Sequence, residues 1–184
     1  IQSTNVGLQA EQGGSVVLRG GNVSVTALKN GAALLTGGKL ELQSGELTLR
    51  GTGAANSAGI SMTGPVQISG GKLTVSDVDI AVKNVSTYTA TFSGGSHSLT
   101  ASTVGYADNA AGALTVENTA DVTFNAPTAI QLSRGKGGKL NLTGGKLTLN
   151  CTDAGLSVLA GAGKATLSGG TLNVNDTGDT PNAT

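Results

Sequence analysis

Apolar and polar residues alternate in short runs along the whole chain, and the runs recur at nearly constant spacing. In residues 137–150 two such runs, 140–142 and 147–149, lie on either side of a Gly144–Gly145 pair. An apolar residue at every second position is the pattern of a β-strand with one buried face. The pattern therefore predicts two short strands joined by a glycine corner, and no stretch of helical period competes with it.

The same phrase recurs along the chain. The first apolar position after the corner recurs at intervals of 24, 26, 24, 25, 25 and 25 residues, at Val23, Leu47, Leu73, His97, Val122, Leu147 and Leu172. The strand before the corner gives a companion series at Val16, Leu40, Val66, Ala90, Leu114, Leu140 and Ala165. A small residue followed by an apolar one, such as Gly155–Leu156, precedes each pair and predicts a third strand in every repeat.

A three-strand unit of about 25 residues cannot bury its apolar face alone, so successive units must stack. We predict an all-β fold, a single-stranded, right-handed parallel β-helix (solenoid) of about seven three-strand coils, about 25 residues per coil. One β-helix domain spans residues 1–184. Its coils begin near residues 5, 30, 57, 79, 103, 127 and 153, and residues 175–184 form a partial coil or a tail.

Composition and charge limit the partners. Eleven basic and eleven acidic side chains give a formal net charge of zero, so we expect no capture of nucleic acid. No apolar run approaches the length of a membrane span, so we expect no membrane insertion. The single cysteine, Cys151, excludes an internal disulfide framework, and we interpret it as a small half-buried corner residue. Because the chain begins in mid-pattern at Ile1, we expect a mature or trimmed fragment.

Few residues suggest catalysis or metal binding. His97 is the only histidine and its position points inward; no triad-like spacing accompanies it, so we predict no catalytic residue. We expect a core histidine hydrogen-bonded to backbone, the alternative being a local bulge that turns it outward. Calcium takes six to eight oxygen ligands. The corner pairs Asp77 with Asp79 and Asp176 with Asp179 could contribute to calcium sites, although aspartate is also an ordinary turn residue. We expect either no cofactor or calcium.

The outward side chains after the corner form two files of hydroxyls and amides. One file is Ser24, Thr48, Thr74, Ser98, Thr123, Thr148 and Asn173, and the other is Thr26, Arg50, Ser76, Thr100, Asn125, Asn150 and Asn175. They could meet a polysaccharide or an ice lattice, or simply form ladders that stabilise a solvated face. The Arg50 interruption counts against ice.

Cations also line the predicted outer surface. Arg134 and Lys136 lie in an excursion at 133–138, and four GGKL phrases place Lys39, Lys72, Lys139 and Lys146 outward, where they could contact acidic sugars or stay solvated. The candidate ligand face therefore consists of Thr48, Thr74, Thr123, Thr148, Asn125, Asn150, Lys72, Lys146, Arg134 and Lys136. Since the chain has two Tyr, two Phe and no Trp, glycan binding would have to be polar.

The phrases at 70–84 (GGKLTVSDVDIAVKN) and 144–178 carry a resemblance to a known group of proteins. The chain resembles bacterial extracellular parallel β-helix proteins, closest to the glycine-rich carbohydrate-binding β-helix family, and adhesin-like repeats are also similar. The resemblance implies extracellular binding of acidic plant polysaccharide, often with calcium at acid-rich corners. At the matching corner this chain has two acidic residues, in the series Asn5, Asn30, Ser57, Asp79, Thr103, Pro127 and Asp153.

These observations favour a non-enzymatic, secreted or cell-surface β-helix that binds carbohydrate or mediates adhesion to host or cell-surface glycans through its outward Thr, Asn and Lys faces. An alternative is a structural stalk or scaffold segment of a larger surface protein, with end-to-end stacking or further domains. Two more alternatives are a polysaccharide lyase or glycoside hydrolase, whose clustered carboxylates are not discernible here, and ice binding.

Overall fold

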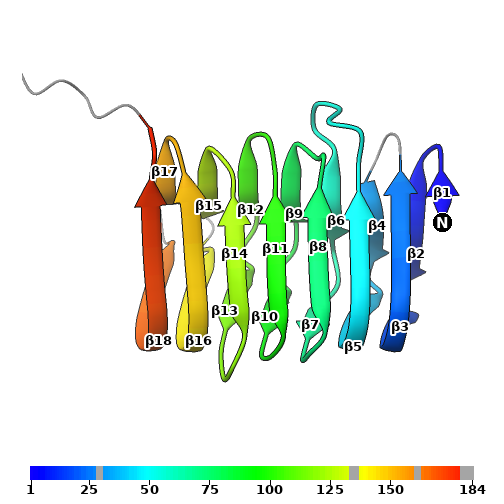
Figure 1. Ribbon diagram of the computed structural model, residues 1–184, viewed down its shortest axis with the longest axis horizontal. Coiled ribbons are helices and arrows are strands. Elements are labelled where there is room, and N and C mark those ends of the chain that lie inside the picture. The colour runs from blue at the N-terminus through cyan, green and yellow to red at the C-terminus, as the bar shows by residue number, and fades with distance from the viewer. Residues whose placement is uncertain (28–30, 133–136, 160–162, 179–184) are drawn as a thin grey trace, which may run out of the picture.

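The fold consists of β-strands in two sheets (Figure 1). The computed structural model describes residues 1–27, 31–132, 137–159 and 163–178, and no helix occurs among them. The smaller sheet takes one strand from each coil: β2 (Val6–Glu11), β4 (Gly31–Thr36), β6 (Ala58–Met62), β9 (Ile80–Asn84), β12 (Val104–Asp108), β15 (Thr128–Leu132) and β17 (Ala154–Val158).

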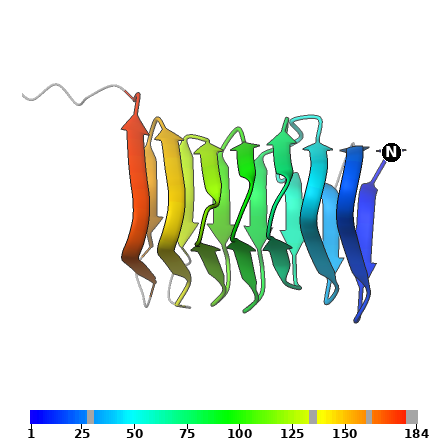
Figure 2. The same cartoon turned by 60° about the horizontal axis from the view of Figure 1, so that its bottom comes forward.

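The larger sheet holds the other two strand positions of each coil and bends at the glycine corner (Figure 2). In the middle coils the corner separates two strands: β7 (Val66–Ile68) from β8 (Lys72–Ser76), β10 (Thr89–Phe92) from β11 (Ser96–Thr100), and β13 (Ala113–Val116) from β14 (Asp121–Asn125). In the outer coils one strand runs through the bend: β3 (Ser15–Ala27), β5 (Lys39–Arg50), β16 (Lys139–Cys151) and β18 (Lys164–Asp176). The two-residue strand β1 (Gln2–Ser3) pairs with the end of β3.

Successive coils stack in parallel, which confirms the predicted solenoid. Every pairing between these strands is parallel. Leu47 pairs with Leu73 and Leu73 with His97, at offsets of 26 and 24 residues. The strands wind through about six turns of about 25 residues each. The seven strands of the smaller sheet begin at residues 6, 31, 58, 80, 104, 128 and 154.

In four of the Gly-Gly corners, 70–71, 94–95, 144–145 and 169–170, the two glycines serve different purposes. The second glycine takes a positive φ, 72° at Gly71 and 85° at Gly95, which side chains with a Cβ rarely adopt. The first glycine is needed for space, because a Cβ on Gly70 would lie 2.5 Å from the carbonyl oxygen of Gln43 one coil earlier. Where the fifth coil lacks the pair, Asn118 takes the positive φ of 52°. The corner therefore follows directly from the repeated Gly-Gly phrase.

The core is a set of vertical columns of apolar side chains between the sheets. We use "column" for the residues at one position in successive coils. In the column before the corner, Leu42, Ile68, Phe92, Val116 and Leu142 are at most 1% exposed. The alternation that the sequence shows thus divides the side chains into buried and solvent-facing columns, and function must reside in the latter or at the ends.

Candidate functional site

The predicted threonine file lies on the flat outer face of the strands that follow the glycine corner. Thr48 of β5 pairs with Thr74 of β8, and Thr123 of β14 pairs with Thr148 of β16. All four side chains are half-buried between their neighbours. The file therefore forms a regular but shallow surface.

The lysines beside this file are neutralised by carboxylates from the preceding coil. Lys72 lies 2.9 Å from Glu46, and Lys146 lies 3.5 Å from Asp121. Lys39 likewise forms an ion pair with Glu41, and this hydrogen bond from Lys39 is the main reason that the pKa of Glu41 is lowered. Lys72 and Lys146 are therefore part of cross-coil ion pairs, and Lys39 is paired within its own strand, so none of the three is an open cation site for acidic sugars. Arg134 and Lys136 lie outside the described residues.

The second predicted file contains an asparagine ladder. The Nδ2 of Asn150 donates to Oδ1 of Asn125 at 2.7 Å, and Nδ2 of Asn175 donates to Oδ1 of Asn150 at 2.8 Å. Nδ2 of Asn125 in turn donates to the hydroxyl of Thr100 at 3.3 Å. Each amide has two donor hydrogens and two acceptor lone pairs, and the ladder uses only one of each on Asn150. The file thus keeps hydrogen-bonding capacity for a ligand.

A row of four shallow hollows lies where the strands that follow the glycine corner end and the chain turns toward the smaller sheet; we call this row the corner groove. Their volumes are about 330, 420, 260 and 260 Å³ from the first coil to the last. Neighbouring hollows share lining residues: the first and second share Thr26, the second and third share Gly53 and Asp77, and the third and fourth share Ala101. The groove therefore runs along the solenoid axis and not into the core.

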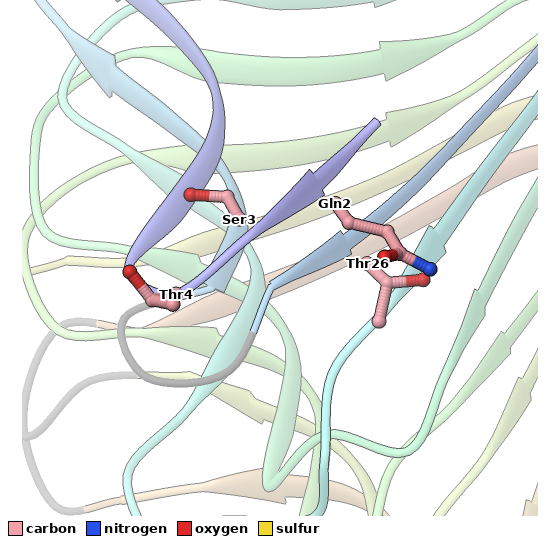
Figure 3. Close-up of a pocket in the computed structure, with 4 residues that line it drawn as sticks. All are labelled: Gln2, Ser3, Thr4 and Thr26. Carbon is pink, nitrogen blue, oxygen red and sulfur yellow. The ribbon is translucent and has the colours of Figure 1, made fainter.

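The first hollow lies at the end of the groove where β1 meets β3 (Figure 3). Gln2 and Thr26 pair across these strands, and their side chains lie side by side, apart from Ser3 and Thr4. The four residues that line it are all uncharged and carry hydroxyl or amide groups. This end of the groove offers neutral hydrogen-bonding groups.

The charged side chains that line the corner groove are Arg50 and Asp77. Nε of Arg50 donates to Oδ2 of Asp77 at 2.6 Å, and both side chains are about half exposed, 62% and 48%. Asp77 has a φ of 55°, so the backbone turns sharply after β8. Its carbonyl oxygen accepts from the backbone N of Gly53 at 2.7 Å, in the excursion 51–57 between β5 and β6. The pair supplies one fixed donor and acceptor cluster midway along an otherwise neutral surface.

The described aspartates that were predicted to bind calcium accept hydrogen bonds from protein groups in the structure. Asp79 accepts hydrogen bonds from the backbone N of Asn56 at 2.7 Å and the hydroxyl of Thr103 at 2.7 Å, so it closes the excursion onto the next coil. Asp176 accepts from the backbone N of Gly178 at 2.9 Å, and Asp179 lies outside the described residues. The described residues contain no group of three or more His, Cys, Asp or Glu side chains that could hold a metal ion.

His97 lies in a core column, as the sequence predicts. It is 3% exposed; its Nδ1 accepts from the backbone N of Leu73 at 3.1 Å, and its Nε2 lies 2.8 Å from the carbonyl oxygen of Gly94, to which it donates. Its ring contacts Phe92 with centroids 5.2 Å apart. Burial lowers the pKa of His97, so the neutral imidazole is favoured. The backbone-bonded histidine that the sequence predicts is therefore confirmed.

A buried polar cluster that the sequence analysis missed lies at the end of the smaller sheet's central strands. Asn84 donates to the hydroxyl of Tyr106 at 3.1 Å and to the carbonyl oxygen of Tyr88 at 2.8 Å. Asp108, 1% exposed, accepts from the backbone N of Ala110 at 2.8 Å through Oδ1, whereas its Oδ2 has no hydrogen-bond partner among the described residues. Burial raises the pKa of the Asp108 carboxyl.

A buried thiol and a separate hollow lie outside the groove's central part. Cys151 ends β16 and is 3% exposed, more buried than the half-buried position expected, and burial raises the pKa of its thiol. A separate hollow of about 290 Å³ lies on the outer face of the strands that precede the glycine corner, where Gln67 and Thr91 lie between Glu41 and Glu117. Its lining residues come from four successive coils, and none of them lines the corner groove.

The comparisons with known proteins add no family to this picture. The chain matches no protein-family model, no curated protein and no solved structure. No helix in the described residues is long and apolar enough to cross a membrane. The function must therefore be argued from the geometry of the outer surface.

Proposed function

We propose that this chain binds a linear polysaccharide along the corner groove, outside the cell or on its surface, without chemical change to the ligand. The observation that carries the proposal is the continuity of the four hollows through shared lining residues. An extended groove along a solenoid fits an extended polymer, because successive coils present similar groups roughly 4.8 Å apart.

The lining favours a neutral glycan over an acidic one. Its hydroxyl and amide groups match the donors and acceptors of sugar hydroxyls, while Arg50 and Asp77 compensate each other at 2.6 Å. Two of the lysines expected to meet acidic sugars, Lys72 and Lys146, are held by Glu46 and Asp121. Binding would be polar, since the rings of Phe92, Phe124 and Tyr106 are buried and only Tyr88 is exposed, outside the groove.

Substitutions at two residues of β11 can distinguish binding in the groove from binding on the flat threonine face. Thr100 and Ser98 are both exposed on β11, two positions apart, but only Thr100 lines the groove. A long cation at Thr100 would block the third hollow, whereas the same change at Ser98 leaves the groove open. The pair therefore provides a matched test and control.

The experiment is a pull-down on insoluble neutral polysaccharides (cellulose, mannan, xylan), followed by calorimetric titration with oligosaccharides of the one that binds. We expect Thr100→Arg to weaken binding about tenfold or more, equivalent to about 1.4 kcal/mol, and Ser98→Arg to bind like the unsubstituted chain. Polygalacturonate, with calcium or with chelator, is the acidic comparison. Loss of binding with Ser98→Arg alone would place the site on the flat face. If none of the insoluble polysaccharides retained the protein, the proposal would be refuted.

A further inference from the structure

Exposed large apolar side chains collect at the two ends of the solenoid. Among the described residues they are Ile1 and Val17 in the first coil, Val158, Leu167 and Val174 in the last, and Val85 and Tyr88 between. Leu167 and Val174 are each 52% exposed, whereas Leu142 and Leu149, which precede them in the same columns, are at most 1% exposed. The last coil therefore orients these side chains as core residues do, and no described residue covers them.

The backbone edges at both ends are also open among the described residues. β18 pairs with β16 on one side over eleven residues, and neither β18 nor β17 has a partner on its outer side. At the other end, β2 has no outer partner, and β1 pairs with β3 only at Thr26 and Ala27. An unpaired strand edge next to exposed apolar side chains is a template for another strand.

We propose that these ends bind each other: the last coil (β17 and β18) of one copy stacks on the first coil (β2 and β3) of a second copy and extends both parallel sheets. The binding partner is another copy, because the first coil offers the strands and apolar residues that would cover the last coil. Its strands run in the same direction, and its apolar residues occupy the same columns, so that Leu172 would stack on Val23 and Leu156 on Leu8. The contact repeats the coil-to-coil interface found throughout the chain.

The outward columns are compatible with this stacking. Lys164 would lie beside Ser15 and Thr171 beside Asn22, so no like charges meet there. Above Asn175, the last asparagine of the ladder in the described residues, the matching column position of the second copy is Thr26, which can hydrogen-bond to an amide as Thr100 does. Because the two ends differ, the contact is heterologous and propagates into an open-ended rod.

The short strand β1 limits this association. The amino group of Ile1 donates to the carbonyl oxygen of Ser24 at 2.7 Å, and the backbone N of Thr26 donates to the carbonyl oxygen of Ile1 at 2.9 Å. These contacts occupy the edge of β3 where Val174 and its neighbours would dock. Stacking over the full width of the coil therefore requires that β1 moves aside, and removal of residues 1–3 is expected to strengthen it.

The association is tested by sedimentation velocity over a concentration series of the 184-residue chain. We expect a mean mass that rises without reaching a plateau, and a rise at lower concentration when residues 1–3 are deleted. Leu167→Lys with Val174→Glu should keep the chain monomeric, whereas Val85→Lys, at an equally exposed valine far from either end, should behave like the unsubstituted chain. A chain that stays monomeric at every concentration, or an equal loss of association with Val85→Lys, would overturn the proposal.

Cysteine cross-linking tests the polarity of the contact independently. Asn22 and Thr171 are exposed and would lie in adjacent strands about 4.8 Å apart, within the range of roughly 4.4–6.8 Å between Cα atoms that a disulfide spans. A mixture of Asn22→Cys and Thr171→Cys proteins should form mixed disulfide dimers, each protein alone should not, and the double variant should form longer chains. Dimers of Thr171→Cys alone would show tail-to-tail association and overturn the head-to-tail arrangement.

Discussion

The buried carboxyl of Asp108 makes the stability of this solenoid depend on pH in a way that one substitution removes. Its column also holds the buried Asn84 and is otherwise apolar, with residues such as Leu35 and Leu132, and the Oδ2 of Asp108 has no hydrogen-bond partner among the described residues. A buried polar atom without a partner costs about 1–3 kcal/mol, and a charged one costs more. Asp108→Asn keeps the Oδ1 that accepts from Ala110 and removes the charge, so we expect a gain in unfolding free energy on the order of 1 kcal/mol at pH 7.

The sign of the pH dependence follows from the raised pKa. The folded protein holds the proton of Asp108 more tightly than the unfolded chain, so ionisation destabilises the fold. The destabilisation is absent below the unfolded pKa of about 3.9, grows as the pH rises through the folded pKa, and is constant above it. Urea unfolding of both proteins from pH 3 to pH 8 should show a difference that vanishes at the acid end. A difference that does not vary with pH, or a less stable Asp108→Asn protein at pH 7, would refute the reasoning.

Three further predictions concern the core and the groove. Leu147→Ala should cost about 2–5 kcal/mol by urea unfolding, because Leu147 is 0% exposed and neighbouring coils hold the cavity open. His97→Leu should destabilise the chain by about 1–3 kcal/mol at pH 8, because Leu73 N loses its acceptor; the difference should shrink below pH 6.5, where the lowered pKa of His97 makes the unsubstituted protein lose stability as the pH falls. A double-mutant cycle on Arg50 and Asp77 should give a coupling below about 1 kcal/mol, since both side chains are about half exposed.

The fold could be predicted from the sequence because two independent regularities agree. Alternation with period two assigns Leu147 and Leu149 to the inside and Thr148 to the outside, and the recurrence near 25 residues stacks each on its counterpart. Register even accounts for the ion pairs: Glu46 and Lys72 occupy one column in successive coils. A solenoid leaves little freedom once the column positions are known.

The site could be predicted only in part, because the shape of a groove depends on how far the loops beside it project from the solenoid. Asn125 and Asn150 were found as members of a file, since strand residues obey the repeat. The hollows between Arg50 and Thr100 depend on the excursion 51–57, which has no counterpart at the same position in the other described coils and therefore no periodicity from which to predict it. Asp108 was missed for a related reason: aspartate signals a turn, and nothing local indicates that this one faces the core.

The division of the chain into inner and outer columns makes the proposed binding experiment interpretable. Side chains of the inner columns, such as Leu49 and Leu99, are fully buried and carry the packing, whereas the outward Thr100 contributes little to it. Substitution of an outward residue on a strand should therefore change a binding surface while the fold stays intact, provided that the new side chain keeps a polar or charged end in water. Loss of polysaccharide binding in Thr100→Arg, with an unchanged urea midpoint, can then be assigned to the groove itself.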